Sequence, residues 1–297
     1  MSSTLAPIVL FAYNRPLHLQ QTVEALLQNP LAKDSLLYIF SDAAKNDDAQ
    51  ALVAQVRSYI HQITGFKQIF IAEKATNAGL APSVIAGVTQ VLEKHQRAIV
   101  LEDDMICSKN FLQFMNDCLD FYQNQSEIFS ISGYTYPLEV PAEYSNDVFI
   151  FPRASSWGWA TWLNRWQQAD WEMKDFATFI KDKQAQKEFN QGGEDLTPML
   201  VKQQKNLISS WAVRWCYTHY IKQGYCLFPV KSKIQNIGTD KSGQHSPNTT
   251  KYDIQLSEAS YTLTKDLSPS PQIYQGLQQF FKLSVVRKVI NYLKFRN

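Results

Sequence analysis

Short apolar runs alternate with segments of helical spacing through the first third of this 297-residue chain. The apolar runs cover residues 7–13, 36–40, 68–72 and 98–101, and the helical spacing covers residues 17–28, 49–63 and 82–94. Strands that alternate with helices in this way predict βαβ units. We therefore expect an α/β fold of the Rossmann-like, doubly wound type, with a mainly parallel sheet flanked by helices.

Polar residues follow three of these predicted strands. They are Tyr13-Asn14-Arg15, Ser41-Asp42 and Glu102-Asp103-Asp104. Sheets of this class bind ligands at the carboxyl ends of their strands. The sequence therefore predicts one crevice that receives all three groups.

The acidic triplet Glu102-Asp103-Asp104 is the most specific chemical signal. Adjacent carboxylates repel one another, and a hard divalent cation such as Mg²⁺ or Mn²⁺ offsets that repulsion, with phosphate oxygens completing its shell. Acids at a helix N-terminus are the alternative, stabilised by about 0.3–1 kcal/mol each, but three acids after an apolar strand exceed that role. We therefore predict a cation that acts as a Lewis acid on a diphosphate leaving group.

Composition restricts the partners and the compartment. A net charge of +2, with 19% charged and 45% hydrophobic residues, gives no reason to expect nucleic acid. Four cysteines, none in a CxxC pair, fit reduced thiols better than a disulfide framework or a zinc site. The N-terminus lacks a signal-peptide pattern, and no run reaches the ~20 apolar residues of a membrane span, so we expect a cytoplasmic protein.

All seven tryptophans lie between Trp157 and Trp215. This shift in composition predicts a boundary near residue 150 and an aromatic-rich subdomain over residues 151–265. Residues 266–297 read as a linker and a C-terminal basic amphipathic helix.

Four segments, taken in order, resemble the GT-A-fold glycosyltransferases. They are PIVLFAYNR (7–15), Asp42, NAGL (77–80) and VLEDD (100–104). Within that fold, the chain is most similar to bacterial sugar transferases of the family-2-like group and to eukaryotic N-acetylglucosaminyltransferase I, over roughly residues 6–120. A second block resembles the bacterial subgroup only; it comprises residues 156–162, 210–215 and 235–238.

The resemblance implies an inverting, metal-dependent transfer of a hexose or N-acetylhexosamine in cell-surface polysaccharide synthesis. The donor would be a nucleotide diphosphate sugar, UDP foremost, bound by residues 1–150, and the acceptor a glycan or lipid-linked glycan bound by residues 151–265. Asp104 would be the direct ligand of Mn²⁺ or Mg²⁺. The implied nucleotide-binding residues are Ala12, Tyr13, Asn14, Arg15, Asp42, Asn77, Gly79, Ser83, Glu102 and Asp103.

Simpler roles stay open for three of these residues. The alternative for Arg15 is a solvated turn residue, and for Asp42 it is a cap after its strand. Gly79 reads equally as a turn glycine with positive φ.

An inverting transfer needs a general base that takes the proton of the acceptor hydroxyl. In the N-acetylglucosaminyltransferase the base is an aspartate directly after a tryptophan, but here Ala212 follows Trp211. The nearest acids, Glu194 and Asp195, are the candidate bases, because a Gly-Gly pair precedes them in a segment that suits a mobile lid, and we place Asp195 ahead of Glu194. The alternative for Asp195 is a helix N-cap.

The acceptor region offers aromatic and basic candidates. Trp157 and Trp159 present rings suited to stacking on sugars, although core packing is the commoner use of tryptophan. Arg214 and Arg153 are candidates for contacts with a diphosphate or an anionic sugar.

Two late features complete the prediction. The resemblance implies that His245 is a further metal ligand; alternatively, His245 or Lys241 contacts the diphosphate, or His245 is a solvated loop residue. The C-terminal helix has apolar spacing that fits docking onto its own domain. A peripheral contact with anionic lipid at the inner face of the membrane is the alternative, and a lipid-linked acceptor would make it useful.

Two other functions compete. A nucleotidyltransferase would open with a glycine-rich phosphate loop after the first strand, and Tyr13-Asn14-Arg15-Pro16 is not one. A non-catalytic glycan-binding relative would explain Ala212, but it has little use for an intact acidic triplet.

Overall fold

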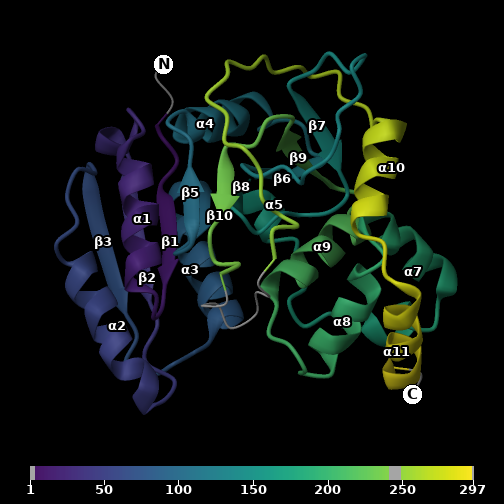
Figure 1. The fold of residues 1–297 in the computed structure, drawn as a ribbon, viewed down its shortest axis with the longest axis horizontal. Coiled ribbons are helices and arrows are strands. Elements are labelled where there is room, and N and C mark those ends of the chain that lie inside the picture. The colour runs from purple at the N-terminus through teal and green to yellow at the C-terminus, as the bar shows by residue number, and fades with distance from the viewer. Residues whose placement is uncertain (1–3, 241–248, 296–297) are drawn as a thin grey trace.

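An eight-stranded sheet crosses the molecule in the computed structural model, which describes residues 4–240 and 249–295 (Figure 1). Its strand order is β3-β2-β1-β4-β8-β6-β9-β7. The strands are β1 Ile8–Ala12, β2 Leu36–Ser41, β3 Gln68–Glu73, β4 Arg97–Glu102, β6 Ile128–Ser132, β7 Val148–Phe151, β8 Trp159–Trp162 and β9 Tyr225–Pro229. Strands β7 and β8 run against the direction shared by the others, so the sheet is mainly parallel.

The predicted α/β class and its first elements are confirmed. The four apolar runs form β1 to β4, and helices α1 Pro16–Leu27, α2 Asp47–Ile60 and α3 Leu80–His95 fill the segments between them. A run such as residues 8–12 is fully buried because helices cover both faces of the sheet.

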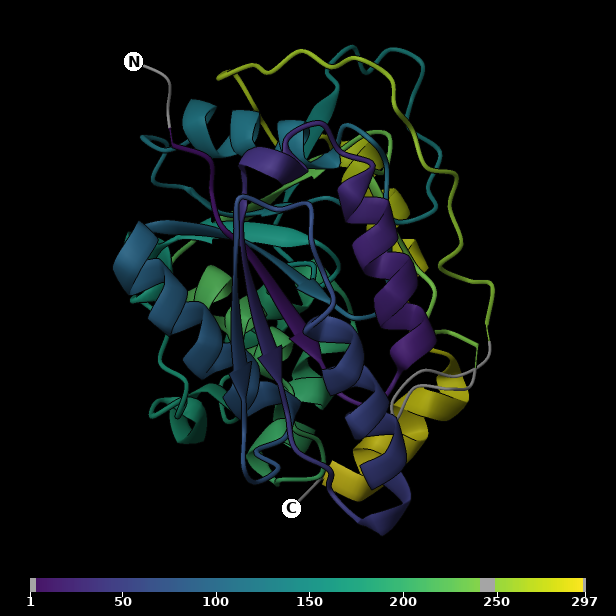
Figure 2. The ribbon, with the colours of Figure 1, turned by 90° about the vertical axis from the view of Figure 1, so that its left-hand side faces the viewer.

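Alternate residues of β1 enter two separate cores. Ile8 and Leu10 pack in one core with residues of α1, such as Leu19, while Val9 and Phe11 pack in the other with residues of α3. Figure 2 shows α1 and α3 on opposite sides of the strands. The result is a helix–sheet–helix sandwich.

The tryptophan-rich part of the chain contributes strands to this same sheet. β8 inserts between β4 and β6 and runs antiparallel to both, with Val100 opposite Trp159 and Ser132 opposite Trp159. The boundaries expected near residues 150 and 265 remain predictions.

Several smaller elements complete the chain. A separate antiparallel pair is formed by β5 and β10. The bounds are β5 Met105–Cys107, β10 Ile234–Asn236, α4 Phe111–Phe121, α5 Leu163–Trp166, α6 Phe176–Phe179, α7 Lys183–Phe189, α8 Leu196–Gln204, α9 Trp211–Ile221, α10 Pro271–Phe280 and α11 Val285–Phe295, with 3-10 turns η1 Ala32–Asp34 and η2 Asn190–Gly192. The C-terminal segment therefore contains two helices rather than one. Ser270 caps α10 by accepting a hydrogen bond from the Ile273 amide.

The four cysteines are buried and unpaired: Cys107, Cys118, Cys216 and Cys226. Burial raises the pKa of the Cys107 and Cys226 thiols to about 12. Within the described part of the chain, no helix is both long enough and apolar enough to cross a membrane.

Candidate functional site

The three polar strand ends predicted to share a crevice lie side by side. Strand β1 pairs with β2 on one side and with β4 on the other, which places Ala12 opposite Ser41 and Phe11 opposite Glu102. The residues that follow each strand therefore emerge at one edge of the sheet, as the sequence predicted.

Arg15 is the counter-ion of the acidic triplet. Its Nη2 donates to Asp103 Oδ1 at 2.5 Å and to Asp104 Oδ2 at 2.8 Å, and both aspartates are buried. The Tyr13 amide donates to the second oxygen of Asp103 at 3.2 Å. Burial alone would lower the Arg15 pKa, but the two carboxylates outweigh it and raise the pKa above its ordinary value. The reading of Arg15 as a solvated turn residue is therefore wrong.

The single positive charge of Arg15 does not balance the three carboxylates. Asp104 Oδ1 is buried and has no hydrogen-bond partner. Burial, and then the charges of Asp104 and Asp103, raise the pKa of Glu102 to about 8, although Arg15 and the side chain of Trp211 act in the opposite direction. The cluster therefore retains an uncompensated demand for positive charge.

These oxygens fit a hard cation only in part. Across residues 4–240 and 249–295, no three His, Cys, Asp or Glu side chains converge as a ready-made metal site. Mg²⁺ and Mn²⁺, however, are commonly held by one or two carboxylates together with substrate phosphates. The unpartnered oxygen of Asp104 suits that kind of site. His245, predicted as a further metal ligand, and Lys241, the alternative contact for the diphosphate, lie outside the described residues.

A glycine closes the cluster from the opposite side. The β5–β10 pair places Asn236 opposite Met105, and the Ile237 amide donates to the Asp104 carbonyl at 2.8 Å. A Cβ added to Gly238 would overlap Asp104 Oδ2 and lie 2.7 Å from Arg15 Nη1. The segment 235–238 was part of the resemblance, but its contact with the acids was not predicted.

Thr22 also supports the triplet and was missed by the sequence analysis. Its hydroxyl donates to the Asp103 carbonyl at 2.9 Å and accepts from the Met105 amide at 3.0 Å. Thr22 is a polar residue on the buried face of α1, beside Leu19 and Val23, and this was the available signal.

Asp42 anchors the loop over residues 77–79. Its two carboxylate oxygens accept from the amides of Ala78 and Gly79 at 3.0 and 2.9 Å, and from Asn77 Nδ2 at 3.2 Å. The Ala43 amide donates to it at 2.9 Å, so its capping role is present. Contact between Asp42 and a nucleotide base remains a prediction.

The remaining predicted nucleotide residues border these two groups. Gly79 has φ of 80° and directly precedes α3 at the N-cap position, which fits the turn reading. Ser83 is buried and accepts from Lys74 Nζ at 3.3 Å. Ala12 is buried at the end of β1, and Asn14 is half-buried in the turn that follows.

The two candidate bases are bound to other groups. Arg153 holds Asp195 through two parallel bonds of 2.8 and 2.9 Å, and it stacks on Phe281 with its guanidinium carbon 3.8 Å from the ring centre. Glu194 accepts from Lys288 Nζ and from the Leu283 amide. Among the described residues, no hydrogen bond or ion pair joins either carboxylate to the acidic triplet. Asp195 stands at the N-cap position of α8 but makes no side-chain capping bond.

The acceptor candidates serve the core or the backbone in this conformation. Trp159 is 1% exposed and stacks on Trp211 with ring centres 4.8 Å apart, so its face is not open to a sugar. Trp157 is half-buried against Tyr134. Arg214 donates to two backbone carbonyls, and burial lowers its pKa.

Comparison with known proteins finds only weak similarity. No protein-family model matches the chain, and no curated protein matches it. The mannosyltransferase PcManGT from Pyrobaculum calidifontis, in complex with GDP-Man and Mn²⁺, is similar over 54% of this chain and 45% of its own, at 11% identity and a TM-score of 0.38. S. aureus TarS is similar over 80% of this chain and 37% of its own, at 9% identity and a TM-score of 0.43. The chain thus covers less than half of either solved chain.

Proposed function

We propose that this chain is a glycosyltransferase that uses a divalent cation to transfer a sugar from a nucleotide diphosphate, UDP foremost, to a glycan or lipid-linked acceptor. The supporting observation is the cluster at the end of β4. It combines Asp103 and Asp104, one arginine, and a buried carboxylate oxygen that lacks a partner. Inversion at the anomeric carbon, a hexosyl or N-acetylhexosaminyl donor, action in polysaccharide synthesis and a cytoplasmic site belong to the same proposal.

The cation would be held by Asp104 with the help of Asp103. When bound, it supplies Lewis-acid stabilisation of the charge that develops on the departing diphosphate. Arg15 adds a second positive charge, already fixed beside the acids. Because its guanidinium is held before substrate arrives, it stabilises developing phosphate charge with little reorganisation.

The surrounding bonds fix the geometry of this cluster. The Tyr13 amide and Arg15 set the plane of the Asp103 carboxylate, and Thr22 fixes the turn that carries both aspartates. Gly238 leaves room for the Asp104 carboxylate where any side chain would collide. The loop over residues 77–79, held by Asp42, would border the base and ribose.

Asp195 remains the proposed general base. To accept a proton from the acceptor hydroxyl, its carboxylate would first have to part from Arg153, at least at one oxygen. Asp195→Asn should then reduce sugar transfer while leaving Mn²⁺ binding intact. Glu194→Gln tests the second candidate in the same way. Equal transfer by Asp195→Asn and wild type would remove the assignment.

The central test measures nucleotide release and metal binding together. UDP-sugars and GDP-sugars are incubated with and without Mn²⁺, and free nucleoside diphosphate is measured; Mn²⁺ binding is followed by electron paramagnetic resonance. Asp104→Asn should abolish metal-dependent release and weaken Mn²⁺ binding, whereas Asp48→Asn, at an exposed position in the first turn of α2, should change neither. Full metal-dependent release by Asp104→Asn would contradict the proposal.

A further inference from the structure

Helix α11 exposes an apolar stripe. Val285, Val286, Val289 and Leu293 are 77%, 69%, 51% and 70% exposed. At about 100° per residue they fall within roughly 100° of the helix circumference, so they form one continuous face. The sequence favoured docking of the C-terminal helical segment onto the protein's own domain; α10 does so through the buried Ile273 and Leu277, whereas these four side chains of α11 stay exposed.

A different face holds α11 in place. Lys288 forms an ion pair of 2.8 Å with Glu194, and the Leu283 amide, just before the helix, donates to the same carboxylate. Lys288 lies about 60° from Val285 on the helix, on the side away from Val286. The tether therefore leaves the apolar stripe directed outward.

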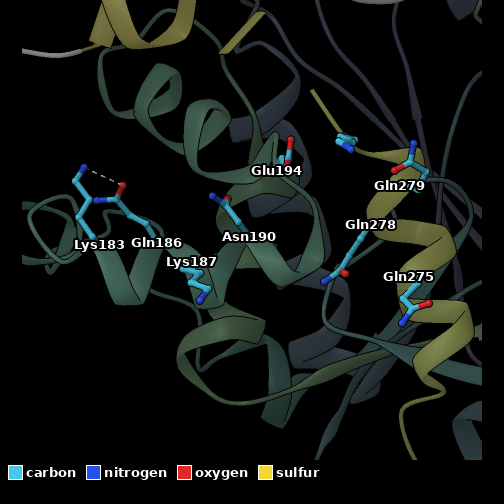
Figure 3. Close-up of a pocket in the computed structure, with 9 residues that line it drawn as sticks. Lys183, Gln186, Lys187, Asn190, Glu194, Gln275, Gln278 and Gln279 are labelled. Atoms are coloured by element: carbon cyan, nitrogen blue, oxygen red, sulfur yellow. Dashed lines mark hydrogen bonds between the residues drawn. The ribbon is translucent and has the colours of Figure 1, made fainter. Parts of the chain in front are cut away.

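A basic groove adjoins the start of this helix. It encloses about 730 Å³ between α7 and α10. Its cationic lining residues are Lys183 and Lys187, labelled in Figure 3, together with Lys282. Among the described residues that line the groove, Glu194 is the one acidic side chain, and it is already paired with Lys288. Much of the remaining lining is uncharged amide, including Gln275 and Gln278, so the groove has a net positive charge.

We propose that the apolar stripe and the basic groove form one surface that binds the face of an anionic lipid bilayer. Valine and leucine side chains would enter the boundary between headgroups and acyl chains, and the three lysines would contact lipid phosphates. An amphipathic helix with basic residues beside its apolar face has this character. Lys282 lines the basic groove and lies three residues before Val285, so the groove and the apolar stripe are adjacent along the chain.

Charge favours lipid over a second copy of this chain as the occupant. Two copies of the chain that met through this surface would bring their lysines close together, and these positive charges would repel. An anionic lipid leaflet would instead attract the lysines. Figures 1 and 2 both place α11 toward the side to which β1 runs. Bound in this way, the enzyme would hold the edge of its sheet near acceptors carried by lipid. This last step depends on the proposed function, but the lipid contact does not.

The experiment is therefore a binding assay that requires no activity. The full chain is sedimented with vesicles of phosphatidylcholine alone and with vesicles that are half phosphatidylglycerol, at low and high salt. We expect binding to the anionic vesicles that falls with salt. The stripe variant, Val285→Gln, Val286→Gln, Val289→Gln and Leu293→Gln together, should bind at least tenfold more weakly.

The groove variant, Lys183→Gln, Lys187→Gln and Lys282→Gln together, should lose roughly fivefold per lysine. Leu17→Gln with Leu207→Gln is the matched control, because these leucines are 72% and 62% exposed on other segments. Light scattering reports oligomeric state, and circular dichroism reports folding. Absence of wild-type binding, unchanged binding by the stripe variant, or a dimer that the stripe variant abolishes would each overturn the proposal. Vesicle binding without nucleotide release would leave the lipid contact standing and count against the transferase alone.

Discussion

Gly238→Ala tests whether Asp104 lies where the cation binds. The added methyl would overlap Asp104 Oδ2, and it would lie 2.7 Å from Arg15 Nη1 and 3.0 Å from Asp104 Cγ. Ordinary contacts of this kind begin at 3.4 Å. Gly238 is not among the glycines with positive φ, so alanine suits its backbone and the cost is steric.

The structure indicates where that cost falls. Overpacking by one methyl group in a closely packed site costs about 1–3 kcal/mol. The cheapest relief is rotation of the Asp104 carboxylate away from Gly238, which also breaks its 2.8 Å bond to Arg15. If the cation uses this carboxylate, its dissociation constant should rise by about 5- to 150-fold, the range that corresponds to 1–3 kcal/mol.

Paramagnetic resonance titration of Mn²⁺, with and without UDP, measures this change directly. Gly276→Ala is the control, because no atom lies within 4 Å of its added Cβ and the residue is inside α10. It should leave Mn²⁺ binding unaltered and stabilise the fold by about 0.5–1 kcal/mol. A Gly238→Ala protein that is folded and binds Mn²⁺ as wild type does would refute the placement of the ion at Asp104.

Three further outcomes are expected. Burial and the neighbouring aspartates raise the Glu102 pKa from 4.5 to about 8, so the folded metal-free protein keeps a proton that the unfolded chain loses. The free energy of unfolding should therefore fall as pH rises from about 4.5 to about 8, and Mn²⁺ should restore it. Identical pH profiles of melting temperature for wild type and Glu102→Gln would contradict this. Asp42→Asn removes a charged acceptor from the amides of Ala78 and Gly79 and should cost about 1–3 kcal/mol in urea unfolding; no loss would show that the loop does not depend on this anchor. The four buried thiols should resist iodoacetamide in the native protein and all react after unfolding, counted by mass spectrometry; rapid native labelling would contradict their burial.

The local sequence pattern was sufficient to predict the first four strands and the helices between them. Strands β1, β2 and β4 are apolar runs buried on both faces, and their polar endings mark the edge where ligands bind, whereas the edge strand β3 is only partly buried. The positions of Arg15, Asp42 and the acidic triplet at one edge followed from parallel order alone. Pairing between Arg15 and Asp103 did not, because turn residues carry no periodic signal.

Long-range contacts could not be predicted. Strands β5 and β10 have three residues each and are far apart in the chain, so no local pattern announces their pairing or the approach of Gly238 to Asp104. The partners of Glu194 come from near the C-terminus, which a local reading as a mobile lid could not foresee. Amphipathic spacing in α11 identified an apolar face, but it could not say whether protein or solvent meets that face.

The insertion of β8 between β4 and β6 constrains how this protein can be made. Strand β4 gains its second neighbour only after residues 159–162 have left the ribosome, and β6 depends on the same segment and on the later β9. A fragment that stopped at residue 150 would expose unpaired backbone along both strands, an arrangement prone to pairing with other chains. The acidic cluster at the tip of β4 is therefore completed late in synthesis, when the second half of the chain closes the sheet around it.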